Sequence, residues 1–431
     1  MPPERHLAAL TSHSRALPTS SSIEGRPTIL LVSTSFWFST ARLAVALAKA
    51  GFSVEAVSST SHPLRKTPAV AKSYSYSGLR PLRSVATAIA SSGPDLVLPC
   101  DDLAARHLRD LCDPRSGADP ALLALIERSI GPRTSFPIVQ SRPAFMAIAE
   151  AEGIRIPKTE AITNPTELER WLQGAQFPVV LKADGTSSGE GVAIVRSTKE
   201  ARRALAVLEA PPPVIVALKR AIVDSDFTQV APVALRRRNH ICAQSYIAGT
   251  ESTSLVACWA GKVLASLHFE VVMKQHAAGP SSVLRLIDHP EMTSAVEKMV
   301  CRLNLSGLHG FDFMLEKSTG NAYLIEINPR TTQVGHLTLG PGRDLPAALF
   351  VALQGHGPES NTVLTDKNIV ALFPQEWIRD PSSPYLLCAY HDVPWDEPEL
   401  VRDAVRRRGK LRAWYSQQKW LRFVSGRKLP Q

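Results

Sequence analysis

The segment 310–330 places the tightest constraint on the fold, because two stretches of alternating apolar and polar residues flank a Thr-Gly-Asn turn. This pattern predicts a β-hairpin, in which residues two positions apart share one strand face. Glu326, Asn328 and Arg330 therefore project to the same side of the hairpin. Asp312 reaches that side from the partner strand. The sequence thus predicts four polar side chains on one face of an otherwise apolar hairpin.

The chemistry of these side chains favours a site for a metal ion and an anion. Asp312, Glu326 and Asn328 supply two carboxylates and an amide oxygen, which are hard ligands suited to Mg²⁺ held between protein and phosphate. Arg330 beside them could bind an anionic substrate or stabilise a transferring phosphoryl group. The alternative is an ordinary exposed hairpin, which does not explain why polar side chains gather on one face beside apolar neighbours.

A second motif lies upstream, in the segment 177–195. An apolar stretch leads to Lys182, and the turn at 185–191 is rich in Gly and Ser. Backbone N–H groups of such a turn can fold over phosphate oxygens, and a lysine at the strand end adds a positive charge. The spacing differs from that of the GxxxxGK[ST] phosphate loop. The alternative is a mobile hairpin with a surface lysine.

Together and in this order, the two motifs resemble those of the ATP-grasp superfamily, above all its biotin carboxylase and carbamoyl-phosphate synthetase branch and the related carboxylate–amine ligases. The resemblance covers residues from about 28 to 355, and the segments 333–336 and 342–345 are also similar to the biotin carboxylase pattern. It implies a nucleotide held between two α+β lobes under a glycine-rich flap formed by residues 185–191. It also implies ATP and Mg²⁺ (or Mn²⁺) as cofactors.

The resemblance implies roles for individual residues. Lys182 and Arg330 match catalytic positions, while Asp312, Glu326 and Asn328 match metal-binding positions. The implied nucleotide-binding residues are Arg142, Lys182, Gly185, Ser187, Ser188, Gly189, Gly191, Gln244, Tyr246, Ile247 and Glu251.

Within the implied nucleotide site, Arg142 and Lys182 would contact phosphates. Main-chain groups near Gln244 and Ile247 would pair with adenine, and Glu251 could reach the ribose. Two positions depart from the common pattern of the family. Many members have Lys where this chain has Arg142, and Glu is more frequent where it has Gln244.

The region before these motifs predicts a small parallel α/β layer. An apolar strand at 28–34, a helix at 39–50 and a strand at 53–58 make one βαβ unit, and a further strand follows at 95–99. The turn after the first strand lacks the GxGxxG pattern, which argues against dinucleotide binding there.

The predicted fold class combines α/β and α+β: a Rossmann-like N-terminal domain, then a two-lobed ATP-grasp fold, then a small basic C-terminal extension. A helix at 143–152 and a helix that begins at Asn164 and Pro165 precede a region in which strands dominate as far as residue 330. The expected parts are a disordered leader at 1–26, the Rossmann-like domain at 27–138, the ATP-grasp domain at 139–355 with lobes at about 139–247 and 248–355, and the extension with its basic tail at 356–431.

Positive charge is concentrated at the C-terminal end. The sequence has a net charge of +10, and residues 400–431 hold ten Lys or Arg and one acid, a net of +9, which leaves +1 for the rest. The body is therefore not predicted to bind nucleic acid. The tail could form a basic amphipathic helix that binds an anionic membrane or nucleic acid, but a solvated helix packed on the catalytic body is favoured.

Cysteine use and hydropathy favour the cytoplasm. Six cysteines occur without a CxxC pair, which fits neither a disulfide framework nor a zinc module, and all six are expected as buried apolar residues. No stretch approaches the roughly 18 uninterrupted apolar residues of a membrane-spanning helix. Residues 1–26 lack the apolar core of a secretory signal.

Several polar residues give weaker signals. Lys274 and His276 could face the γ-phosphate of a nucleotide, but a solvated strand end is favoured. His268 and His309 are expected as core or edge histidines. The two aspartates at 101–102 either line a substrate cleft at the carboxyl end of their strand or cap a helix.

The predicted function is that of an ATP-dependent, ADP-forming ligase acting on a small-molecule carboxylate and an amine, through an acyl phosphate. Three alternatives stay open. One is a bicarbonate-activating enzyme of the carboxylase or carbamoyl-phosphate type, ranked lower because no amidotransferase, biotinyl carrier or second ATP-grasp copy is recognisable. The others are a non-catalytic ATP-binding regulatory module, and a binding protein that acts through its basic tail.

Overall fold

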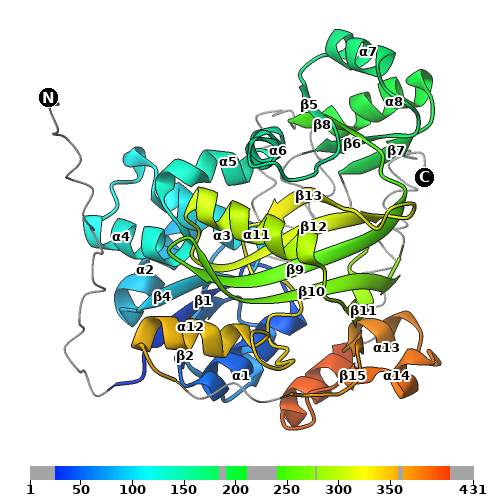
Figure 1. Ribbon diagram of the computed structural model, residues 1–431. Helices are drawn as coiled ribbons and strands as arrows, with labels where there is room; N and C mark the ends of the chain where they lie inside the picture. Colours follow the sequence, from blue (N-terminus) through cyan, green and yellow to red (C-terminus); the bar gives the residue numbers. More distant parts are fainter. Residues whose placement is uncertain (1–24, 184–190, 211–239, 277–278, 358–362, 408–431) are drawn as a thin grey trace, which may run out of the picture.

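The structure, a computed structural model, describes residues 25–183, 191–210, 240–276, 279–357 and 363–407. Three sheets organise these residues (Figure 1). The predicted disorder of the leader, up to residue 24, and the predicted tail beyond residue 407 lie outside the described residues.

The first sheet is parallel, with the strand order β3-β2-β1-β4. It confirms the predicted Rossmann-like layer, since the apolar run Thr28–Val32 is almost entirely buried at its centre. Its elements in chain order are β1 (Thr28–Val32), α1 (Phe38–Ala50), β2 (Ser53–Ser58), β3 (Val70–Ser75), α2 (Pro81–Ser92), β4 (Leu96–Pro99), α3 (Asp102–Leu111) and α4 (Pro120–Ile130). Two short helices, α5 (Phe136–Gln140) and α6 (Arg142–Ala151), lead out of this layer.

A small antiparallel sheet forms the next unit, with the strand order β5-β8-β6-β7. Its elements are β5 (Thr159–Ile162), α7 (Pro165–Gln173), β6 (Val179–Ala183), β7 (Val192–Val195), α8 (Thr198–Glu209) and β8 (Ile241–Ser245). The predicted start of α7 is confirmed, because the Asn164 side chain accepts a hydrogen bond from the Glu167 N–H at 2.9 Å and Pro165 follows it.

The large sheet has seven strands in the order β13-β12-β9-β10-β11-β14-β15. The predicted hairpin with the turn Thr319-Gly320-Asn321 is the connection β12–β13, and a second tight turn at Ala260-Gly261 connects β9 with β10. Its strands are β9 (Gly249–Trp259), β10 (Lys262–Lys274), β11 (Ser281–Leu286), β12 (Gly307–Glu316), β13 (Ala322–Asn328), β14 (Ile369–Leu372) and β15 (Tyr390–Asp392), and its helices are α11 (Pro290–Leu303), α12 (Leu345–Gln354), α13 (Gln375–Arg379) and α14 (Tyr385–Cys388).

The two faces of the large sheet have different partners (Figure 1). Val256 and Cys258 of β9 pack with α11 in one core, whereas Leu255 and Ala257 pack in another core with β1, α1 and α12. Alternation along a strand explains this division. The first sheet and the large sheet therefore share one continuous apolar core, which fixes the position of one sheet relative to the other.

Some features differ from the sequence expectations. Within its described residues, helices α8 and α11 interrupt the region in which strands were expected to dominate. The Ser-x-x-Glu capping pattern begins α8: the Ser197 hydroxyl accepts from the Glu200 N–H at 3.2 Å, and the Glu200 carboxylate accepts from the Arg196 N–H at 2.8 Å. Cys301 and Cys388 are exposed, so the expectation of six buried cysteines is wrong for these two, while the other four are buried and all six are free thiols. Cys301 lies on the outer face of α11, whose inner face alone contacts the sheet.

The chain beyond residue 355 is part of the body. Strands β14 and β15 extend the large sheet, and a helix at 398–407 packs Leu400 and Ala404 against Phe38. For residues 398–407 this agrees with the favoured picture of a helix packed on the body. Among the described residues, no helix combines the length and apolarity that crossing a bilayer requires.

Candidate functional site

Two strands of the large sheet bring the predicted carboxylates together. Asp312 on β12 lies opposite Glu326 on β13, at a point where the register of the two strands shifts. Gly310 makes room for the chain that follows β13, because a Cβ atom there would lie 2.6 Å from the Thr332 side chain. The sequence prediction of one polar face on this hairpin is confirmed.

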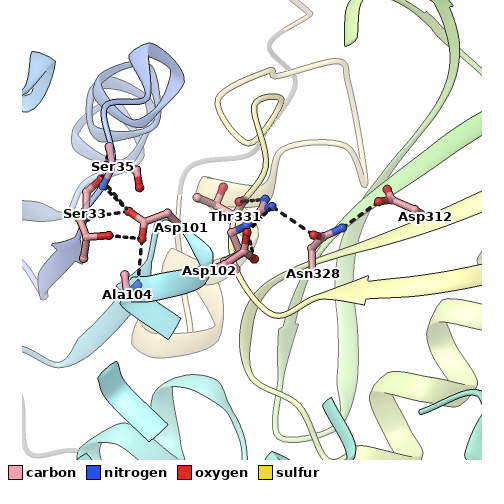
Figure 2. A network of polar contacts seen from close by, with 10 residues as sticks. Ser33, Ser35, Asp101, Asp102, Ala104, Asp312, Asn328 and Thr331 are labelled. Atoms are coloured by element: carbon pink, nitrogen blue, oxygen red, sulfur yellow. Dashed lines mark hydrogen bonds and ion pairs between the residues drawn. The ribbon is translucent and has the colours of Figure 1, made fainter. Parts of the chain in front are cut away.

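A chain of hydrogen bonds runs outward from Asp312 (Figure 2). The Asn328 amide donates to Asp312 Oδ2 at 2.9 Å, and Arg330 Nη2 donates to Asn328 Oδ1 at 3.1 Å. Arg330 then reaches the first sheet, where its Nε and Nη2 atoms donate to the two Asp102 carboxylate oxygens at 2.8 and 3.2 Å. Arg330 therefore links the large sheet to the start of α3.

Two further cations approach the carboxylates from the other side. Arg142, the first residue of α6, donates from Nη2 to Glu326 Oε2 at 2.7 Å. Lys182 extends from β6 of the small sheet and is only 6% exposed, so the alternative of a surface lysine is wrong. Glu326 and Arg142 are among the charged groups that act on the pKa of Lys182. The site thus joins all three sheets.

The proximity of these charges shifts their pKa values. Burial, and then the neighbouring Glu326, raise the pKa of Asp312 to about 7. Burial alone would raise the pKa of Glu326, but Arg142 and Lys182 outweigh it, and the net shift is downward. Burial lowers the pKa of Lys182 despite the attraction of Glu326. Perturbed pKa values of this kind cluster at functional sites.

The donor set suits a hard divalent cation. Among the described residues no group of three or more His, Cys, Asp or Glu gathers at one place. Asp312 and Glu326 nevertheless supply carboxylate oxygens on one face. Asn328, two residues beyond Glu326, donates its amide N–H to Asp312 and accepts from Arg330 through Oδ1, so its amide would have to turn to offer that oxygen to a cation. A cation between Asp312 and Glu326 would relieve the repulsion between their carboxylates, which together with burial raises the pKa of Asp312. The residues present therefore fit Mg²⁺ shared with phosphate oxygens.

Of the other residues predicted to bind the nucleotide, some lie on or beside the small sheet and some lie outside the described residues. Gln244 is buried between β5 and β6, and its side chain donates to Thr159 Oγ1 at 3.0 Å. Tyr246 is half exposed beyond the end of β8, and Ile247 follows it. Gly191 is described and buried, where it precedes β7. Gly185, Ser187, Ser188 and Gly189 lie outside the described residues.

The polar residues that gave weaker signals in the sequence lie in different surroundings. Lys274, at the end of β10, forms an ion pair with Glu251 at 2.8 Å, so this predicted ribose-contacting carboxylate has a partner within the protein. His268 and His309 are buried, as expected for core histidines. The Asp101 side chain caps α3 by accepting from the Ala104 N–H at 2.9 Å. Asp102, the next residue, instead contacts Arg330.

Sequence reasoning missed the residues that support the loop after Arg330. Gln375 of α13 donates to Gln333 Oε1 at 3.2 Å. Asp392 of β15 contacts His336 at 2.8 Å and is buried. No sequence signal pointed to Gln375 on α13 or Asp392 on β15, because these elements are brought to the loop only by the folding of a distant part of the chain.

Comparison with known proteins identifies the domain that carries this site. Residues 144–334 match the family model described as the ATP-grasp domain, while no curated protein matches the chain by sequence. N5-carboxyaminoimidazole synthase from Aspergillus clavatus, solved with ADP and 5-aminoimidazole ribonucleotide, has a similar fold, with a TM-score of 0.55, 14% identity, and 78% of this chain and 79% of that chain covered.

Two further solved structures are similar. The biotin carboxylase domain of Hydrogenobacter thermophilus 2-oxoglutarate carboxylase, solved with MgADP, ADP and bicarbonate, gives a TM-score of 0.54 at 14% identity, over 77% of this chain and 70% of that one. L-amino acid ligase from Bacillus licheniformis gives a TM-score of 0.50 at 16% identity, over 78% of this chain and 76% of that one.

The chain therefore contains an ATP-grasp domain, which follows a parallel α/β layer. The fold of the chain is similar to that of the N5-carboxyaminoimidazole synthase named above. The resemblance and the fold class read from the sequence are both confirmed.

Proposed function

We propose that this protein is an ATP-dependent, ADP-forming ligase that activates a small-molecule carboxylate for attack by an amine. The observation that carries the proposal is the gathering at one place of Arg142 from α6, Lys182 from the small sheet, and Asp312, Glu326 and Arg330 from the large sheet and the chain that follows it. This place belongs to the ATP-grasp domain. Cations and carboxylates in this arrangement match the needs of phosphoryl transfer, in which positioning and charge compensation provide most of the catalysis.

The cations would bind and orient the nucleotide. Lys182 would contact the α- or β-phosphate, and Arg142 a further phosphate oxygen. Glu326 pairs with Arg142 and attracts Lys182, so it orients both cations towards the same place. Main-chain groups of Tyr246 and Ile247 lie beyond the end of β8, which favours them over the buried Gln244 as partners of adenine.

Asp312, Glu326 and Asn328 would hold Mg²⁺ (or Mn²⁺). When bound, the metal ion neutralises negative charge on the phosphates. Arg330 would orient the substrate carboxylate and stabilise charge on the transferring phosphoryl group. The carboxylate would accept the γ-phosphoryl group to give an acyl phosphate, from which the amine displaces phosphate.

Partners other than small molecules receive less support. Residues 398–407 pack on the body, which leaves only the undescribed part of the basic tail as a candidate for contact with nucleic acid or an anionic membrane. A cytoplasmic location remains a prediction, and it agrees with six free cysteines. The domain bounds drawn from the sequence also remain a prediction.

The decisive experiment measures ADP release from Mg-ATP by the purified protein, with pooled carboxylates, amines and bicarbonate. We expect release to depend on one carboxylate pool together with an amine. Glu326→Gln should lower turnover by at least about a hundredfold, because the cation loses a charged ligand and Arg142 loses its partner.

Glu270→Gln is the matched control, since Glu270 also lies on a strand of the large sheet and pairs with an arginine, Arg285, at 2.6 Å. It should leave turnover within about twofold of the unchanged protein. Equal turnover in Glu326→Gln would contradict the metal assignment. Tight ATP binding without ADP release in any pool would favour the regulatory alternative.

A further inference from the structure

The first sheet offers one place where a substrate would be expected to bind. Its order β3-β2-β1-β4 reverses direction between β1 and β4, since β2 and β3 lie to one side of β1 and β4 lies to the other. In open parallel sheets, ligands bind beyond the carboxyl ends of the strands at such a switch point. The residues there are the loop Ser33–Ser35 after β1 and the two aspartates that follow β4.

Asp101 already occupies the anion-binding groups of this switch point (Figure 2). Its carboxylate accepts from the Thr34 N–H at 2.6 Å, the Thr34 hydroxyl at 2.7 Å and the Ser35 N–H at 3.1 Å. It also accepts from the Ser33 hydroxyl at 3.2 Å and from the Ala104 N–H at 2.9 Å. The donors that could hold a phosphate group here are therefore engaged by a carboxylate of the protein.

Asp102 next to it is placed for a different role. Its side chain is 47% exposed, and it contacts Arg330, which is 19% exposed. Both Asp102 oxygens receive N–H groups of the same guanidinium. Through Asn328, this pair connects with Asp312 at the proposed phosphoryl-transfer centre (Figure 2). A negative and a positive group thus stand side by side at the boundary between the first sheet and the ATP-grasp domain.

We propose that the activated substrate is a free amino acid, whose ammonium group binds Asp102 while its carboxylate lies at Arg330. This inference rests on the proposed ligase function and adds the substrate class. Opposite charges a few ångströms apart on the protein complement the two charges of a zwitterion. A carboxylate without an amino group would compete with Asp102 for Arg330 and offer Asp102 no cation in exchange. A phosphorylated substrate would meet the negative charge of Asp101 and Asp102 at the switch point.

The test compares matched substrates for ADP release from Mg-ATP by the full chain. The probes are pools of L-amino acids, of the corresponding carboxylic acids without the amino group and of the N-acetylated amino acids, each supplied with the same pool of simple amines as acceptors, and phosphorylated amines supplied with bicarbonate. We expect one amino-acid pool to stimulate ADP release at least tenfold more than its deaminated and N-acetylated counterparts.

The variant Asp102→Asn keeps the shape of the side chain and removes its charge. It should raise KM for the amino acid by at least tenfold, leave KM for ATP within about twofold, and reduce the preference over the deaminated acid. Asp119→Asn is the matched control, because Asp119 also stands at the start of a helix in the same layer and its carboxylate accepts from the Ala121 N–H rather than from an arginine. It should leave these constants unchanged.

The outcomes separate this inference from the proposed function. ADP release driven equally by deaminated acids, or by bicarbonate with a phosphorylated amine, overturns the amino-acid inference and leaves an ATP-dependent ligase standing. An unchanged substrate preference in Asp102→Asn also overturns it. ADP release with none of the pools, despite ATP binding, counts against both the inference and the ligase function.

Discussion

At the scale of single residues, buried histidines tie the stability of this protein to pH. Burial lowers the pKa of His62, His268 and His309 to about 4 in each case. His62 shows why the neutral ring is preferred, because its Nδ1 atom accepts from the Leu64 N–H at 3.1 Å and so must lack a proton. Protonation of His62 Nδ1 would break this hydrogen bond.

We therefore expect the free energy of unfolding to fall as the pH is lowered from 6.5 towards 4. In that window the unfolded chain binds protons at these histidines and the folded protein does not, so stability is lost on acidification. Each histidine would contribute a loss of up to about 2 kcal/mol between pH 7 and pH 5. Urea denaturation at several pH values measures this. A stability that stays level across the window would contradict it, and His268→Asn should reduce the slope.

At the scale of elements, the site depends on the close pairing of β9 with β12. Gly249 begins β9 and lies opposite Glu316 of β12. A Cβ atom at Gly249 would lie only 1.8 Å from the Leu315 carbonyl oxygen. The absence of a side chain therefore allows the chain to pass from the small sheet into the strand that supports Asp312.

The substitution Gly249→Ala should displace this end of the strand pair. We expect a loss of at least about 3 kcal/mol in stability, because the clash is with backbone rather than with a side chain that could move. Thermal denaturation measures the effect. Gly174→Ala is the matched control, since a Cβ atom there meets nothing within 4 Å, and it should change stability by less than about 1 kcal/mol. Equal behaviour of the two variants would refute the packing argument.

At the scale of the whole molecule, a buried charge cluster joins the two ends of the described chain. Arg42 of α1 donates to Asp392 Oδ1 at 2.7 Å, and His336 contacts Asp392 Oδ2 at 2.8 Å. Asp392 is buried, and its two partners are the Arg42 guanidinium from the first layer and the His336 ring, whose pKa burial lowers, from the loop that follows Arg330. The C-terminal strands therefore hold the loop that follows Arg330 in position through this carboxylate.

Asp392→Ala should cost about 3–5 kcal/mol, because Arg42 would be left buried without its charge partner. Turnover should fall as well, since the loop carrying Arg330 loses support. Denaturant unfolding and ADP release measure the two effects. Asp396→Ala removes a carboxylate from an exposed pair with Lys49 and should cost no more than about 1 kcal/mol. A small effect of Asp392→Ala would show that the cluster does not join the two ends.

Local patterns account for what could be predicted from the sequence. The apolar run before residue 33, the Asn164-Pro165 helix start and the alternating hairpin 310–330 each depend on neighbouring residues, and each was recovered. The capping box at Ser197 was an equally local signal for α8 that was overlooked. The motif around Lys182 and the hairpin were enough to recognise the ATP-grasp domain, because strand periodicity fixes which side chains share a face.

The sequence by itself therefore determined the fold class and pointed to the charged side chains that we propose act on a nucleotide. Only the tertiary structure decided their partners: Arg142 with Glu326, Arg330 with Asp102, and Asp392 with Arg42. It also decided that β14 and β15 complete the large sheet. These contacts join residues between 184 and 350 positions apart, and packing of the shared core, which no local pattern encodes, brings them within hydrogen-bonding distance.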